Sequence, residues 1–234
     1  MVYSFNDSKA GTTWTGFTFQ WYVDLVSNVQ IMNALKNSLF VAFVTTILAC
    51  TFGTMTALAI YKYNFPGKKL LDILIYIPVV IPDIVLAVAL LAIYGGLQVT
   101  LGTTTVIPGH VAISISFAIF VILSRLARYD RSIEDAAKDL GANEWQTFWR
   151  VTFPLIFPGI LASALLVFTI SLDDFNIAYF NTGPGSSTLP VLVFSMVRRG
   201  VSPEINALST IMILVIVIMV LLIGRSLFSN TKKS

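Results

Sequence analysis

The chain has 234 residues, of which 56% are hydrophobic and only 12% are charged, and its mean hydropathy is +0.82. Because soluble domains carry about 25% charged residues, this composition excludes an ordinary soluble protein and indicates a chain that crosses a membrane several times. The net charge of +3 is modest and no dense basic cluster occurs, so nucleic acid is not an expected partner. The single cysteine, Cys50, lies in an apolar run and cannot form a disulfide within the chain.

Residues 1–33 lack the apolar stretch of a signal peptide, and they include Asp7, Lys9 and Asp24. Aromatic side chains are frequent in this segment: Tyr3, Phe5, Trp14, Phe17, Phe19, Trp21 and Tyr22. Such side chains gather where a membrane meets water. We therefore expect residues 1–33 to form an external segment at the membrane interface, and the alternative is a poorly ordered tail.

Later segments are apolar and long enough to cross a membrane as helices of about 20 residues. These five segments are residues 37–61, 70–95, 106–124, 154–180 and 205–224, and the second is interrupted by Pro78, Pro82 and Asp83. The sequence thus predicts an all-α fold, a polytopic bundle of transmembrane helices over residues 34–228, with a tail at residues 229–234. Within the first segment, Ala49, Gly53 and Ala57 form a row of small residues that lets a neighbouring helix approach closely.

Residues 125–153 are the only long polar stretch between strongly apolar neighbours. Two short helices are predicted in it. Ser132 can cap the first through a Ser-x-x-Asp box, and Gly141 can end it in a left-handed turn. Asn143 can cap the second through an Asn-x-x-Gln box, and Pro154 closes the interval. The alternative is a solvated loop between two spans.

The Lys and Arg side chains are unevenly divided between the two sides of the predicted membrane. Eleven fall on one side: Lys62, Lys68, Lys69, Arg125, Arg128, Arg131, Lys138, Arg150, Arg225, Lys232 and Lys233. Only four fall on the other: Lys9, Lys36, Arg198 and Arg199. Because cytoplasmic segments carry the excess of basic residues, the central loop 125–153 and the C-terminus are predicted to be cytoplasmic.

Ionisable side chains inside a membrane cost about 2.5–3.5 kcal/mol each on insertion scales, so each needs an explanation. Asp83, Asp173 and Asp174 fall within predicted spans, and counting about 1.5 Å per residue places them toward the outer side. Together with Glu204, they are candidates for an acidic pathway that admits a cationic solute. The alternatives are structural: Asp83 could cap a helix that restarts after Pro82, and Asp174 could end a span. Glu204 could favour a helix start, with Ser202 as the cap and Pro203 at the first position.

Other chemistry is not expected. The lone histidine, His110, follows Pro108 and Gly109 at the end of a span, and it is expected to be structural rather than a ligand. No His or Cys cluster suggests a metal site. The sequence has no Gly-x-x-x-x-Gly-Lys-Ser/Thr loop to hold ATP phosphates and no evident nucleophile–base pair, so we do not expect an enzyme.

A spaced motif runs through the central loop: Asp135-Ala136-Ala137, three residues, Gly141, nine residues, Val151-x-Phe153-Pro154. It resembles the EAA loop of the ABC-transporter importer permeases, with Asp for Glu, Val for Ile and Phe for Leu at unchanged spacing. The resemblance implies a type I importer permease, whose cytoplasmic loop docks into a groove of an ATP-hydrolysing subunit. These seven residues would then be the coupling surface, and ATP and magnesium would bind to the partner. Because members usually have six spans, the family's first span is expected to be missing from this chain.

Longer segments resemble the spermidine/putrescine permeases of this family: IPDIVLAVALL, SRLARYDRSIEDAAKDLGA, SLDDFNIAYFNTGPGSSTLPVLVFSMV and RRGVSPEINALSTI. The resemblance implies ATP-driven polyamine import by alternating access across a bacterial plasma membrane. Its implied partners are a second permease subunit, a pair of ATP-binding subunits and an external polyamine-binding protein. The acids suit polyamines, whose ammonium groups need carboxylates or aromatic faces outside water. The alternatives are an importer permease for another solute, and an ion-coupled secondary carrier that uses Asp83 and Asp173 directly.

Overall fold

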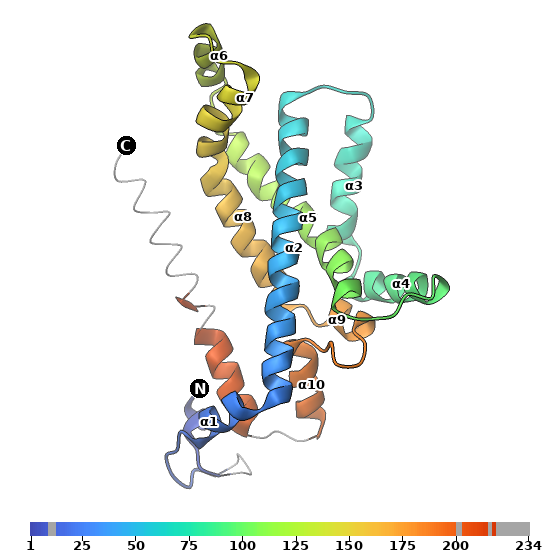
Figure 1. Cartoon of the computed structure of the whole chain (residues 1–234), viewed down its shortest axis with the longest axis vertical. Helices are drawn as coiled ribbons and strands as arrows, with labels where there is room; N and C mark the ends of the chain where they lie inside the picture. The colour runs from blue at the N-terminus through green and yellow to red at the C-terminus, as the bar shows by residue number, and fades with distance from the viewer. Residues whose placement is uncertain (9–12, 200–202, 215–216, 219–234) are drawn as a thin grey trace. The chain divides into compact units, whose positions relative to one another are not determined.

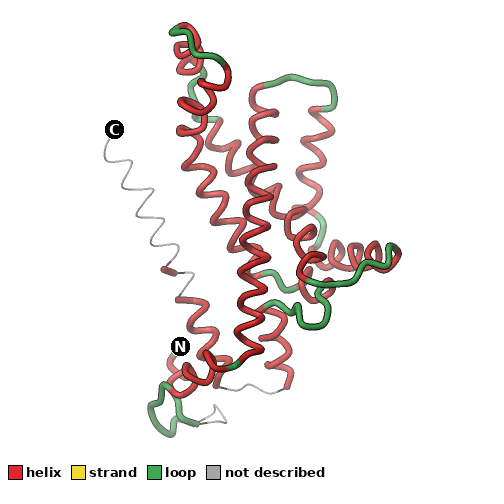
Figure 2. The backbone as a smooth tube through the Cα atoms, in the orientation of Figure 1, coloured by secondary structure: helices red, strands yellow, loops and turns green. Residues whose placement is uncertain are grey.

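The structure is a computed structural model, and it describes residues 1–8, 13–199, 203–214 and 217–218. The described residues form helices joined by loops, as Figure 2 shows, so the all-α fold predicted from the sequence is confirmed. The chain divides into two units, Phe40–Asn181 and a unit made from both ends of the chain, Met1–Leu39 with Thr182–Ser234. Helix α2, Val29–Lys62, contributes to both.

Three helices form the core of the unit Phe40–Asn181. Helix α5 (Thr103–Leu126) packs along α8 (Phe153–Asp173), and α2 lies beside them (Figure 1). Their contacts bury apolar side chains that include Ala57, Ile119, Ile122, Leu126 and Ile156. Burying these side chains away from water holds the three helices together.

The row of small residues in α2 makes the close helix contact that the sequence predicts. Ala49 and Ala57 are fully buried. A Cβ atom placed on Gly53 would lie 2.8 Å from the Cβ atom of Ala118 on α5. Since no room remains for even a methyl group, α2 and α5 approach each other at this glycine as closely as their backbones permit.

Three predicted spans are continuous helices, long and apolar enough to cross a membrane: Val29–Lys62, Thr103–Leu126 and Glu144–Asp173. The first begins before residue 37, so the boundary expected at residues 33–34 falls inside a helix. The expectation that the fourth span runs over 154–180 is wrong at both ends. Its helix begins earlier, and the backbone becomes extended at Asp174 (ψ 125°) before the short helix α9, Asn176–Asn181.

The predicted span 70–95 is broken into two helices, α3 (Lys68–Val80) and α4 (Asp83–Gly96), which meet at 102°. Figure 1 shows α4 turning sharply away from the direction of α3. A proline disfavours the helical conformation of the residue before it, and Ile81, before Pro82, has ψ 129°. The span is thus interrupted at Pro82 as expected, and the two helices form either one broken span or a re-entrant loop. A helix does restart after the break, but Pro82 takes the cap position and Asp83 is the first helical residue, so the alternative that Asp83 caps this helix is wrong.

The N-terminal residues of the other unit are ordered where they are described, which contradicts the alternative of a poorly ordered tail. They form the turn η1 (Val2–Phe5) and helix α1 (Gln20–Ser27). Trp21 is buried, and its indole N–H donates to the backbone oxygen of Asn6 at 2.7 Å. The rings of Phe5, Phe17, Phe19 and Tyr22 pack with centroids 5.1–6.3 Å apart.

The same unit contains α10 (Leu189–Arg199) and a helix over Pro203–Leu214. Pro203 and Glu204 are helical, and the residues directly before them lie outside the described residues, so the helix start predicted at Pro203 stays a prediction. The predicted capping residue Ser202 lies outside the described residues, as do most of residues 215–224 and the tail 229–234.

Candidate functional site

The loop between α5 and α8 folds into two short helices, α6 (Ser132–Asp139) and α7 (Glu144–Thr147), followed by a π-helical turn η2 (Phe148–Thr152) that continues into α8. The capping box predicted for α7 is confirmed. The side chain of Asn143 accepts a hydrogen bond from the backbone N–H of Gln146 at 2.9 Å, and the side chain of Gln146 accepts one from the backbone N–H of Asn143 at 3.1 Å. This loop is therefore an ordered structure with its own caps.

The other boundary predictions for this loop are partly corrected. Ser132 does not cap α6; its own backbone N–H donates to the carboxylate of Asp130 at 2.9 Å, and this bond lowers the pKa of Asp130. Gly141 adopts the predicted left-handed conformation, with φ +89°. Pro154 does not close the interval, because α8 begins at Phe153 and takes the proline into its first turn.

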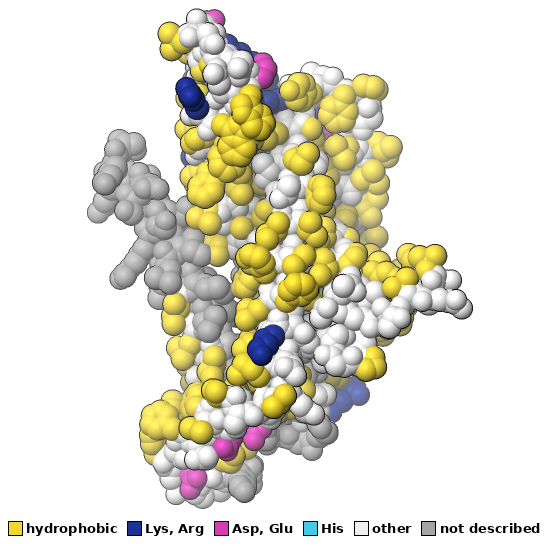
Figure 3. All heavy atoms as spheres, in the orientation of Figure 1, with side chains coloured by type: hydrophobic (Ala, Val, Ile, Leu, Met, Phe, Trp, Pro, Cys, Tyr) yellow, Lys and Arg dark blue, Asp and Glu magenta, His cyan; other side chains and the backbone are white. Residues whose placement is uncertain are grey.

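The motif residues lie on the surface of this loop or at its junction with α8. Four of them are exposed: Asp135, Ala136, Gly141 and Pro154. The other three are half-buried: Ala137, Val151 and Phe153. Two large apolar side chains beside them are also uncovered, Leu140 (89% exposed) and Trp145 (69%). Figure 3 shows charged and apolar side chains together at this end. Exposed apolar side chains rimmed by polar ones are typical of a surface that another protein covers.

One acidic side chain of α6 is buried. Both carboxylate oxygens of Glu134 accept hydrogen bonds from Lys62 Nζ, at 2.7 and 2.8 Å, and Thr152 Oγ1 donates to the same carboxylate at 2.6 Å. Burial raises the pKa of Glu134, but the hydrogen bonds from Lys62 and Thr152 outweigh it, and the pKa lies below its usual value. We call Lys62, Glu134 and Thr152 the charged node; it joins α6 to the ends of α2 and η2.

Sequence reasoning missed the charged node. One signal was available, because Glu134 and Ala137 are three residues apart and share a helix face, and a carboxylate beside a small, half-buried alanine indicates an inward position. Its partner Lys62 is 72 positions away in the sequence, so no local pattern could have paired them.

A second contact ties the start of α6 to α2. The guanidinium of Arg131 lies 4.4 Å from the ring centroid of Tyr61 and also donates to the backbone oxygen of Tyr61. The Tyr61 hydroxyl in turn donates to the backbone oxygen of Tyr129 at 3.1 Å. Burial and the negative charge of Glu134 raise the pKa of Tyr129 to about 12, so this phenol stays neutral beside the charged node.

The structure brings Asp83 and Asp174 to the same small cavity, of about 30 Å³, between α4, α5 and the end of α8. Buried His110 lines the same cavity: its Nδ1 is 2.7 Å from Ser171 Oγ and its Nε2 is 3.0 Å from Asp174 Oδ1. Since about 10–15 Å³ holds one water, this space fits a water or a single ammonium group and no larger solute. The hydrogen bonds give His110 the structural role expected of it.

The remaining predicted acids lie elsewhere. Asp173 is exposed at the last residue of α8 and does not line the cavity that Asp174 lines. Glu204 belongs to the other unit, within the helix Pro203–Leu214. Among the described residues, no group of three or more His, Cys, Asp or Glu side chains could hold a metal ion.

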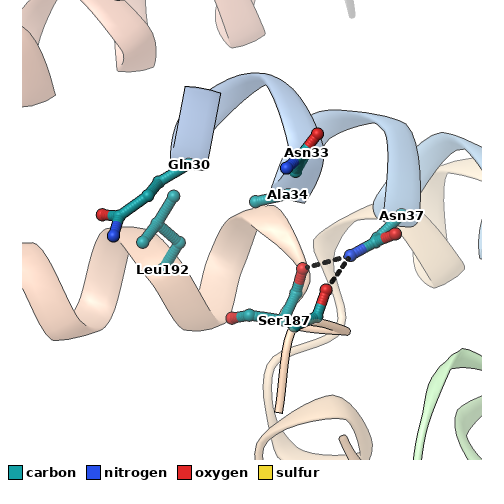
Figure 4. A pocket seen from close by; sticks show the side chains of 7 residues that line it. Gln30, Asn33, Ala34, Asn37, Ser187 and Leu192 are labelled. Carbon is teal, nitrogen blue, oxygen red and sulfur yellow. Dashed lines mark hydrogen bonds between the residues drawn. The ribbon is translucent and has the colours of Figure 1, made fainter. Parts of the chain in front are cut away.

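A larger groove, of about 330 Å³, lies in the unit made from the ends of the chain (Figure 4). Gln30, Asn33 and Asn37 line it from one face of α2, opposite Ser187 and Leu192. Asn37 Nδ2 donates to the backbone oxygen of Ser187 at 3.0 Å, which fixes the wall of the groove. Its lining offers uncharged hydrogen-bonding groups, so it does not provide the carboxylates that a multivalent cation requires.

Comparison with known proteins identifies several similar chains. The family model described as "Binding-protein-dependent transport system inner membrane component" matches residues 49–229. The spermidine/putrescine transport system permease protein PotC of Escherichia coli (strain K12) is 38% identical over 221 residues, covering 94% of this chain and 84% of the relative. The putrescine transport system permease protein PotI of the same organism is 40% identical over 220 residues, covering 91% of this chain and 78% of the relative.

The fold is also similar to that of a solved structure. The crystal structure of a bacterial ABC transporter involved in the import of the acidic polysaccharide alginate aligns with a TM-score of 0.74, covering 94% of this chain and 87% of that chain. Their sequences are 16% identical, so this likeness concerns the arrangement of helices alone.

Proposed function

Because this chain belongs to the family of binding-protein-dependent transport system inner membrane components, we propose that it is the permease subunit of an ATP-driven importer of polyamines. The observation that carries the proposal is the identity of 38–40% to two polyamine permeases over more than nine-tenths of the chain. The chain is not an enzyme, since ATP hydrolysis belongs to a separate ATP-binding subunit.

The proposed assembly resembles that of the relatives. A second, PotB-like permease would complete the pore, a pair of PotA-like subunits would bind ATP and magnesium, and a PotD-like protein would deliver polyamine from outside. We place the central loop 125–153 and the C-terminus on the cytoplasmic side of a bacterial plasma membrane. The excess of Lys and Arg in these segments supports this orientation, because cytoplasmic segments carry more basic residues.

The proposed coupling surface consists of the motif residues of the central loop: Asp135, Ala136, Ala137, Gly141, Val151, Phe153 and Pro154. The exposed apolar side chains of Leu140 and Trp145 support this assignment, because they give a partner a surface to bury. ATP binding would bring the partner subunits together and move the docked loop, the spans would open outward, and hydrolysis would return them.

The proposed polyamine pathway includes Asp83, Asp173, Asp174 and Glu204. Support is best for Asp83 and Asp174, which reach one cavity with room for a single ammonium group. Asp83 lines that cavity and is exposed, whereas Asp174 is already hydrogen-bonded to His110. We therefore assign Asp83 as the carboxylate that receives the cation and Asp174 as its neighbour.

The test is uptake of labelled spermidine by cells that lack their own polyamine importer and carry this chain with its candidate partner subunits. Uptake should require an active ATPase. Asp83→Asn should raise the KM for spermidine by about tenfold, as expected for loss of one charge-assisted hydrogen bond. The matched control is Asp24→Asn, in helix α1, which should leave KM unchanged. Uptake that persists with inactive ATPase subunits would instead support an ion-coupled carrier. An assembled complex that takes up another solute but no spermidine would contradict the polyamine assignment.

A further inference from the structure

The charged node connects parts of the chain that are distant in sequence. Helix α6, which carries the first half of the motif, follows α5 and precedes α7 along the chain, so the backbone links it directly to α5 and α8. It has no such backbone link to α2. Lys62, the last residue of α2, supplies a side-chain link through its two hydrogen bonds of 2.7 and 2.8 Å to Glu134, and the Arg131–Tyr61 contact supplies another.

The charged node holds α6 and the end of α2 in a fixed arrangement. Glu134 is buried, Thr152 is fully buried, and the side chain of Lys62 is only 22% exposed. Moving α6 away from Lys62 would leave a carboxylate in a poorly solvated site without its counter-charge, and breaking one partner of such a pair is strongly unfavourable. The Arg131–Tyr61 contact restrains the same two helices one turn away. Helix α6 and the end of α2 should therefore move as one body.

The chain contains a contrasting pair in the same loop. Lys138 and Glu144 form an ion pair of 2.6 Å, with side chains 40% and 79% exposed, and it joins only α6 to α7. Exposed pairs contribute little because water and salt screen them. A comparison of the two pairs therefore separates the effect of a linkage between spans from the effect of any Lys–Glu contact in the loop.

We propose that the charged node transmits the movement of α6 to α2 and α8 together, and that Lys62 and Glu134 are positioning residues for the coupling of ATP hydrolysis to transport. This inference rests on the proposed function, since it assumes that the loop 125–153 docks on the ATPase subunits. It adds that α2, which has no backbone connection to that loop, is driven by a side-chain linkage.

The first test compares transport with hydrolysis in the complete complex in proteoliposomes. Lys62→Met and Glu134→Gln should retain the ATPase subunits and hydrolyse ATP, but they should move less spermidine per ATP hydrolysed. The expected loss is about fivefold, which is the middle of the range by which single residues between two sites change their coupling. Lys62→Arg should retain most of the coupling, and the exchange of Lys62→Glu with Glu134→Lys should recover part of it. Lys138→Met is the matched control and should behave as wild type. An unchanged ratio in Lys62→Met, or an equal loss in Lys138→Met, would overturn the proposal.

The second test does not depend on the solute. Spin labels at Asn64→Cys and Asp139→Cys, in a Cys50→Ser background, report the distance between the end of α2 and the end of α6. In the wild-type complex this distance should be the same in the nucleotide-free and the vanadate-trapped states. With Lys62→Met added it should differ between the two states. A distance that stays equal in Lys62→Met would contradict the linkage. Failure of spermidine uptake with the expected distance behaviour would instead contradict only the polyamine assignment.

Discussion

Gly141 is the residue of the proposed coupling surface whose substitution would act through the backbone rather than through a neighbour. It has φ +89°, and a Cβ atom added there would meet nothing within 4 Å. The penalty for substitution is therefore one of backbone conformation, about 1–2 kcal/mol for most residues but less for Asn, which tolerates this region. We expect Gly141→Asn to retain ATPase binding and uptake, and Gly141→Val to lose most of both. Co-purification of the ATPase subunits and spermidine uptake measure this. Equal activity of the two variants would show that the turn is not required.

The charged node should give the chain a recognisable dependence on acid. The pKa of Glu134 is below its usual value of 4.5 in the folded chain, so its contribution to stability is present above that value and is lost as pH falls through the folded pKa. Glu134 should therefore cause no change in the melting temperature of the wild-type complex between about pH 6 and 8.

Replacing Lys62 removes the positive charge that helps to lower the pKa of Glu134. In Lys62→Met, burial still raises the pKa of Glu134, while the largest opposing effect is gone. The loss of the carboxylate charge should therefore begin at a higher pH than in wild type. Thermal unfolding measured against pH for the wild type, Lys62→Met and the control Lys138→Met tests this. Superimposable wild-type and Lys62→Met profiles would mean that the node does not set the pKa.

At the scale of elements, the contact between α2 and α5 depends on Gly53. An alanine there would place its Cβ 2.8 Å from that of Ala118, and this neighbour cannot move without its backbone. Such overpacking costs about 1–3 kcal/mol. Gly53→Ala should lower the melting temperature of the purified complex. Gly95→Ala on α4 is the control: nothing lies within 4 Å of the added Cβ, and alanine is favoured over glycine in a helix by about 1 kcal/mol. A melting temperature of Gly53→Ala equal to that of Gly95→Ala would contradict the close contact.

The elements also show where sequence reasoning succeeds. Length and hydropathy were sufficient for α5, and side-chain chemistry was sufficient for the Asn143 cap, because both are local properties. Hydropathy does not encode direction, so the turn of 102° after Val80 was not predicted even though Pro82 was noted. The capping role of Ser132 was wrong because α6 begins at Ser132 itself, one position too late for a cap, and the carboxylate of Asp130 accepts its backbone N–H.

The candidate sites also differ in how far they could be predicted from the sequence. The coupling motif could be found because its spacing is fixed along one stretch of chain. The meeting of Asp83 with Asp174 could only be suspected, since depth along two separate spans does not say whether two side chains face each other. The charged node could not be predicted from the sequence, because its members come from three separate elements.

At the scale of the whole molecule, the division of basic residues predicts which segments each side of the membrane can reach. In a Cys50→Ser background, Ser132→Cys should react with a membrane-impermeant thiol reagent only after the cells are opened. Pro184→Cys, in the loop after α9, should react in intact cells. Removal of the buried native thiol makes each signal specific. Labelling of Ser132→Cys in intact cells would reverse the proposed orientation.

The unit Phe40–Asn181 leaves much of its spans uncovered. Only half of the apolar window of Thr103–Leu126, and a third of those of the other two continuous spans, is buried within the chain. The described residues do not cover the remaining apolar surface, and contact with lipid or with protein is more favourable for it than contact with water. This exposure is consistent with a subunit of a larger membrane complex.

The break between α3 and α4 also has an electrical consequence. Helix α3 has 13 residues and rises about 20 Å, so in the proposed orientation Asp83 lies about one third of the way into a hydrocarbon core of about 30 Å from the outside. A charge that crosses the whole membrane gains about 2.3 kcal/mol per 100 mV, so each ammonium that reaches Asp83 gains roughly 0.8 kcal/mol. If the proposed site at Asp83 receives the cation, we expect loading to be electrogenic: an inside-negative voltage should strengthen it before any ATP is hydrolysed, and collapse of that voltage should weaken it.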